Sequence, residues 1–70
     1  MYELNDTFNG LLISRHRSLS AAVRADMAHN RAVKKANGQS SYIPTSITMD
    51  GERLSDEANE ESMRIAHDYE

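Results

Sequence analysis

Residues 18–38 read SLSAAVRADMAHNRAVKKANG, and this alanine-rich stretch without proline predicts one long helix. Ser18 or Ser20 can cap the first free backbone N–H groups of that helix. A glycine just past the last turn is a common left-handed stop, and Gly38 stands in that place. We therefore expect a helix from about Ser18 to Gly38, and we derive the rest of the fold from its position.

One side of this predicted helix is apolar at helical spacing. Its members are Leu19, Ala22, Val23, Met27 and Val33. Asp26 and Asn30 interrupt this stripe, which is narrow. We therefore expect the helix to pack against one surface rather than to be surrounded by protein.

The size and composition indicate one domain with a thin core. The chain has 70 residues, of which 39% are hydrophobic, below the usual share for a globular protein. Self-association would add stability to such a chain. It contains no cysteine, which excludes disulfides, thiolate chemistry and cysteine-ligated zinc, and we expect a cytoplasmic protein. Since we find neither a secretory signal pattern nor an apolar run of about 20 residues, we expect no membrane association.

Three segments have the character of strands. Residues 1–5 and 11–16 surround a turn, and residues 42–49 alternate between apolar and polar side chains. Pro44 cannot donate to a ladder, so it should lie near an edge or at the start of the third strand. Asp50-Gly51 is a turn signal that should end this strand.

The turn between the first two strands leaves two registers open. The Asn-Gly pair at residues 9–10 favours a two-residue turn, which pairs Leu4 with Arg15. That register buries Phe8 but places an aspartate on the core face. A five-residue loop instead pairs Leu4 with Leu12, keeps the aspartate in the loop and leaves Phe8 near the tip as a candidate contact residue. We prefer the second register.

These elements predict an α+β fold. A β-β-α-β core over residues 1–51 should form a three-stranded antiparallel sheet of order 2-1-3 on one long helix, because a right-handed crossover places the third strand beside the first. The tail, residues 52–70, should form a short acidic helix in the same single domain. We expect this tail to cover the sheet face opposite the long helix.

Charge is distributed unevenly along the chain. Residues 14–38 hold six basic residues and one acid, a balance of +5, whereas residues 39–70 have a balance of −6. Basic side chains neutralise phosphates, so a DNA or RNA site would use all six. They are Arg15, Arg17, Arg24, Arg31, Lys34 and Lys35. Arg15 and Arg17 lie near the expected helix N-terminus, where the helix dipole also favours binding of an anion. The alternative is that these arginines pair with Glu3, Asp6 or the acidic tail.

No pattern of catalytic residues is present. His16, His29 and His67 lack the close spacing of metal ligands, and the three glycines are not clustered into a phosphate-binding loop. The serines lack the sequence context of an activated nucleophile. The sequence therefore predicts a protein that is not an enzyme, with no catalytic, cofactor-binding or metal-binding residues.

Two binding functions remain. We prefer a protein-interaction or accessory module that binds a protein partner or a second copy of itself through a sheet face or edge. The alternative is nucleic-acid binding by the six basic residues. The net charge of −3 and the few aromatic residues argue against that alternative. Salt distinguishes the two, because phosphate contacts weaken steeply with ionic strength.

Overall fold

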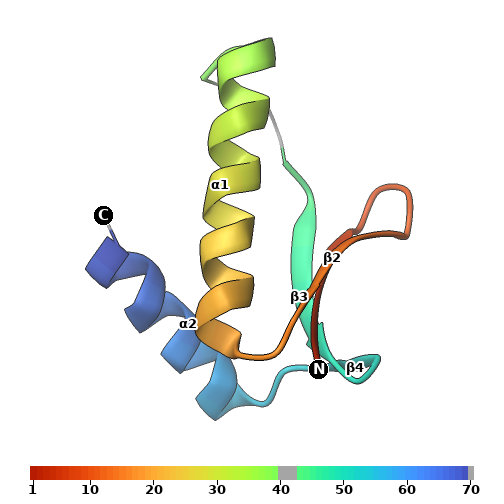
Figure 1. Cartoon of the computed structure of the whole chain (residues 1–70), viewed down its shortest axis with the longest axis vertical. Coiled ribbons are helices and arrows are strands. Elements are labelled where there is room, and N and C mark those ends of the chain that lie inside the picture. The colour runs from red at the N-terminus through yellow and green to blue at the C-terminus, as the bar shows by residue number, and fades with distance from the viewer. Residues whose placement is uncertain (40–42, 70) are drawn as a thin grey trace.

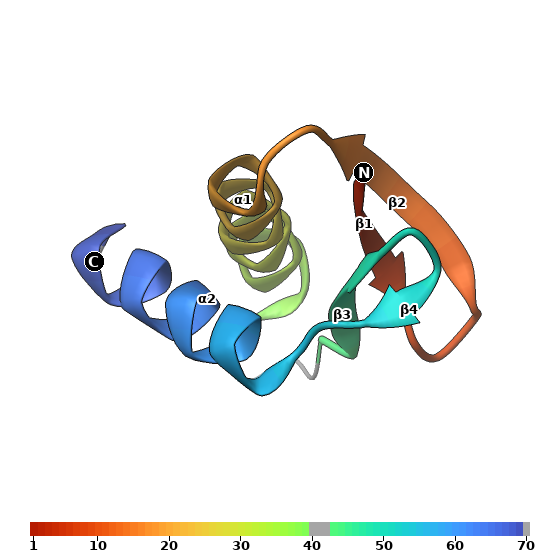
Figure 2. The same ribbon diagram turned by 90° about the horizontal axis from the view of Figure 1, so that it is seen from below.

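The structure, a computed structural model, describes residues 1–39 and 43–69. Its elements, in chain order, are β1 (Tyr2–Asp6), β2 (Leu11–His16), α1 (Leu19–Asn37), β3 (Thr45–Met49), β4 (Glu52–Arg53) and α2 (Asp56–Tyr69). The predicted α+β class, with an antiparallel sheet and two helices, is confirmed. Figures 1 and 2 show both helices on the same side of the sheet.

Helix α1 begins and ends as the sequence predicts. The Oγ of Ser18 accepts a hydrogen bond of 3.1 Å from the backbone N–H of Ala21. Gly38 has a φ of 110°, and its N–H donates to the carbonyl of Lys34 at 2.8 Å. Only a residue without a Cβ adopts this backbone conformation without strain, which explains why the helix stops there.

The sheet has four strands in the order β2-β1-β3-β4, so the prediction of three strands was wrong. The first three do follow the predicted order 2-1-3. Asp50 and Gly51 have φ values of 51° and 83°, and two consecutive positive φ values are typical of a tight hairpin turn. This turn does more than end β3, because it folds the chain back and pairs Glu52 with Met49.

Both predicted registers of the first hairpin were wrong. Leu4 lies opposite Ser14, and after a bulge Asn5 lies opposite Leu12. Residues 7–10 form a four-residue loop between the paired residues Asp6 and Leu11. The bulge inserts one extra residue into β2, which alternation of side chains alone does not reveal.

The core lies between α1 and the centre of the sheet. Leu4 has an exposed fraction of 0%, and Ala22 and Val23 of α1 are also buried. Asp26, which interrupts the apolar stripe of α1, accepts a hydrogen bond of 2.7 Å from the hydroxyl of Thr45. The polar interruption therefore ties α1 to the start of β3. Pro44 immediately precedes this strand, as expected, whereas Tyr42 lies outside the described residues.

The second helix does not cover the open face of the sheet, so that expectation was wrong. Among the described elements, α2 contacts α1 and no strand. Figure 2 shows α2 beside α1, on the same side of the sheet. The face of the sheet opposite the helices carries polar side chains, including an ion pair of 3.1 Å between Arg15 and Glu3. None of the helices in residues 1–39 and 43–69 has the length and apolar character needed to cross a bilayer.

Candidate interaction surface at the β1–β2 hairpin

The hairpin loop is held by the side chain of Asp6. Its Oδ1 accepts hydrogen bonds from the backbone N–H groups of Phe8 at 2.8 Å and Asn9 at 3.2 Å. The carbonyl of Asp6 accepts a further bond from the N–H of Gly10 at 2.8 Å. An aspartate that bonds the backbone two and three residues ahead is a common way to fix a turn. The loop therefore presents Phe8 from an organised backbone.

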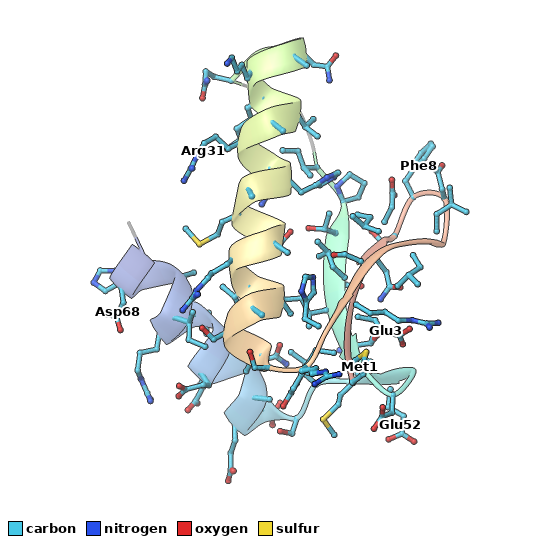
Figure 3. All side chains as sticks on the ribbon, viewed as in Figure 1. Met1, Glu3, Phe8, Arg31, Glu52 and Asp68 are labelled. Carbon is cyan, nitrogen blue, oxygen red and sulfur yellow. The ribbon has the colours of Figure 1, made fainter. Side chains whose placement is uncertain are left out.

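Three large apolar side chains are exposed at this end of the hairpin. The exposed fraction is 83% for Phe8, 62% for Leu11 and 45% for Leu12. Figure 1 shows the hairpin extending away from α1, and Figure 3 shows Phe8 at its tip. We call these three residues the hairpin surface. Leu11 lies opposite Asp6 and Leu12 opposite Asn5, so the two leucines point to opposite faces of the hairpin.

The hairpin surface adjoins a free sheet edge. Strand β2 is the outermost strand on its side, so its outer backbone groups have no strand partner in the part of the chain that the structure describes. Such an edge is a template for another strand. The bulge at Ile13 directly follows Leu12, and the charged Arg15 lies farther from the loop. The apolar residues Leu11 and Leu12 therefore lie between the loop and the bulge.

Replacing Asp6 with alanine should loosen this loop. The Phe8 and Asn9 amides would lose their acceptor, and we expect faster hydrogen exchange at both and a loss of about 1 kcal/mol in the free energy of unfolding. Amide exchange by NMR and urea denaturation measure the two effects. Asp6→Asn is the matched control, because it keeps an acceptor oxygen. Equal exchange rates in wild type and Asp6→Ala would show that the carboxylate does not hold the loop.

The structure places the six basic residues on different elements. Arg15 lies in β2 on the sheet face away from the helices, where it pairs with Glu3, as one of the sequence-based alternatives has it. Arg17 is exposed in the connection to α1. The other four are on α1: Arg24, Arg31, Lys34 and Lys35. Figure 3 shows Arg31 extending away from the sheet, so it and Arg15 do not share a surface.

The histidines lie on three separate elements: His16 in β2, His29 in α1 and His67 in α2. His16 Nε2 is 2.8 Å from the hydroxyl of Ser14 on the same strand. Within residues 1–39 and 43–69, no three or more histidine, cysteine, aspartate or glutamate side chains form a group suited to holding a metal ion.

Sequence reasoning proposed Phe8 as a contact residue but missed Leu11 and Leu12, which it assigned to the apolar start of a strand. It also missed the role of Asp6. An aspartate at the start of a loop, as Asp6 before residues 7–10, is a signal for such a turn.

Comparison with known proteins gives no relative. No protein-family model, no curated protein and no solved structure matches the chain.

Proposed function

We propose that this chain is a protein-interaction module that associates with a second copy of itself through the hairpin surface and the free edge of β2. The observation that carries the proposal is the exposure of Phe8, Leu11 and Leu12 on a loop and strand held in place by Asp6. Aromatic and aliphatic side chains on a pre-organised backbone lose little entropy when they bind, so they suit a contact surface.

A second copy fits this edge because two identical strands can pair antiparallel about a two-fold axis. An axis at Leu12 places that residue opposite its own copy and Leu11 opposite Ile13, the bulge residue. Arg15 then lies opposite Asn9, so no like charges face each other. The pairing joins two four-stranded sheets and places Leu11 and Leu12 of both hairpins at the seam, on its two faces.

The thin core gives a further reason for association. Among the described hydrophobic residues only Leu4, Ala22 and Val23 are fully buried. Burying Phe8 and the two leucines against a second copy removes more apolar surface from water, which stabilises the pair. The six basic residues support the nucleic-acid alternative less well, because Arg15 is on another face from those of α1 and already has an acidic partner.

Light scattering of the purified protein at rising concentration tests the proposal. We expect twice the mass of the chain, with little dependence on salt, because the contact is mainly apolar. A variant with Phe8 and Leu11 both replaced by serine should be monomeric yet folded by circular dichroism, since both side chains are exposed. A monomer at all concentrations would overturn the proposal. A complex with a DNA duplex that dissociates as salt rises would favour the alternative.

A further inference from the structure

A groove of about 530 Å³ lies among α1, α2 and the β3–β4 side of the sheet. Figure 2 shows how α1, α2 and β3 are arranged around this space. The residues that line the groove are Asp26, Thr45–Thr48, Arg53, Leu54, Asn59 and Ser62. A groove of this volume is of the size that small organic ligands occupy, and it is far larger than a single ion requires.

The sheet side of the groove is apolar. Ile47 lies opposite the buried Leu4, so its side chain points to the side of the sheet that carries the helices. Leu54 is half-buried where the chain leaves β4. Arg53 lies opposite Thr48, the neighbour of Ile47, so its side chain starts out on the other face of the sheet. The sheet therefore offers the groove hydrocarbon surface rather than charge.

On the α1 side the groove has a half-buried carboxylate, that of Asp26. Its Oδ1 accepts a hydrogen bond of 2.7 Å from the hydroxyl of Thr45, which is a neutral donor. In the part of the chain that the structure describes, none of the ion pairs includes Asp26. Charged groups that lose contact with water are normally paired with an opposite charge. The carboxylate therefore suits a ligand that carries a positive charge.

On the α2 side two residues add acceptors. The Oγ of Ser62 is buried and has no hydrogen-bond partner among the described residues, although buried hydroxyls are normally bonded. Ser62 itself is half-buried and lines the groove, so a change of its rotamer turns the hydroxyl towards a ligand there. Asn59 lies three residues earlier, on the same side of α2. Its Nδ2 donates to the carbonyl of Leu54 at 3.3 Å, which leaves its Oδ1 as an acceptor.

We propose that this groove binds a small aliphatic primary amine with a single positive charge. The ammonium group has three N–H donors, and it uses them on Asp26, Ser62 and Asn59. The hydrocarbon chain packs on Ile47 and Leu54. The ligand carries one charge because Asp26 is the only acid among the described residues that line the groove. This site is separate from the hairpin surface and does not depend on self-association.

The test compares n-hexylamine with 1-hexanol, which has the same hydrocarbon chain and no charge, in NMR titrations of the full chain at neutral pH. With the amine we expect saturable chemical-shift changes at Thr45, Ile47 and Ser62. The amine should bind at least about tenfold more tightly than the alcohol, because hydrogen bonds between charged groups are stronger than neutral ones. Equal affinities for the two ligands, or shift changes confined to other parts of the chain, would overturn the proposal.

A charge variant tests the position of the ammonium group. Asp26→Asn removes the negative charge but keeps an oxygen that can accept from Thr45, so the fold should persist. We expect its affinity for n-hexylamine to fall at least about tenfold, with little change in its affinity for 1-hexanol. Asp68→Asn makes the same charge change at an exposed position of α2 that does not line the groove, and Figure 3 shows this residue towards the C-terminal end of α2. This control should bind the amine as the wild type does. An equal loss in both variants would mean that the acidic helix attracts the amine nonspecifically, and the proposed site would be wrong.

Discussion

Replacing Leu4 with alanine should lower the free energy of unfolding by about 3 kcal/mol. The side chain has an exposed fraction of 0% and is the largest fully buried side chain among the described residues. It lies opposite Ser14 and Ile47 in the sheet, and the other buried hydrophobic residues that the structure describes, Ala22 and Val23, belong to α1. A core with so few buried side chains has little with which to fill the cavity, so most of the loss should persist.

The expected loss is large compared with the total free energy of unfolding of the domain. A domain of 70 residues has a total stability of about 3.5–10 kcal/mol, so the variant should be partly unfolded at 37 °C. Urea denaturation followed by circular dichroism measures the change. Met63→Ala is the matched control, because Met63 is 67% exposed and should change stability by no more than about 0.5 kcal/mol. Similar losses in both variants would show that the core is not where the structure places it.

The long helix was predictable because its signals are local. Capping by Ser18 and the stop at Gly38 each depend on a few adjacent residues, and both are present in the structure. The approximate places of β1, β2 and β3 likewise follow from local patterns in residues 1–5, 11–16 and 42–49. The order of these three strands followed from the length of the helical connection and its handedness.

Register and the place of α2 were not predictable, because they depend on contacts between distant segments. The bulge opposite Leu4 and Asn5 shifts β2 by one residue, and no single side chain marks it. Prediction of the short strand β4 would have required us to interpret residues 50–51 as a hairpin turn and not only as the end of β3. The acidic helix has enough apolar residues to form, but these do not specify whether it covers α1 or the sheet.

The candidate site was predictable only in part, for the same reason. The sequence indicated a loop aromatic at Phe8 but not its exposure, which depends on how far the hairpin extends beyond α1. It grouped six basic residues by their closeness in the chain. The fold separates Arg15 from the α1 residues, because strand and helix residues that are near in sequence point to different surfaces.

Replacing Leu12 with cysteine should produce a disulfide-linked dimer under mild oxidation. On a two-fold axis at residue 12, the two cysteines lie directly opposite each other in neighbouring antiparallel strands. Opposite residues in such strands have Cα atoms about 4.5–5.5 Å apart, which is within the range that a disulfide spans. The natural chain contains no cysteine, so any cross-link involves the introduced residue. Non-reducing gel electrophoresis of samples oxidised at low protein concentration measures the linked fraction.

Arg15→Cys is the matched control for this cross-link, because it lies on the same strand and is also exposed. With the axis at Leu12, Arg15 lies opposite Asn9, and the two copies of residue 15 are about 20 Å apart along the strands. We therefore expect rapid cross-linking at position 12 and none at position 15. Efficient linkage of both variants would indicate random collision or a shifted register. In an isologous contact, a residue on the two-fold axis always lies next to its own copy. Linkage at neither position, together with a monomer in light scattering, would therefore show that the hairpin surface does not join two copies.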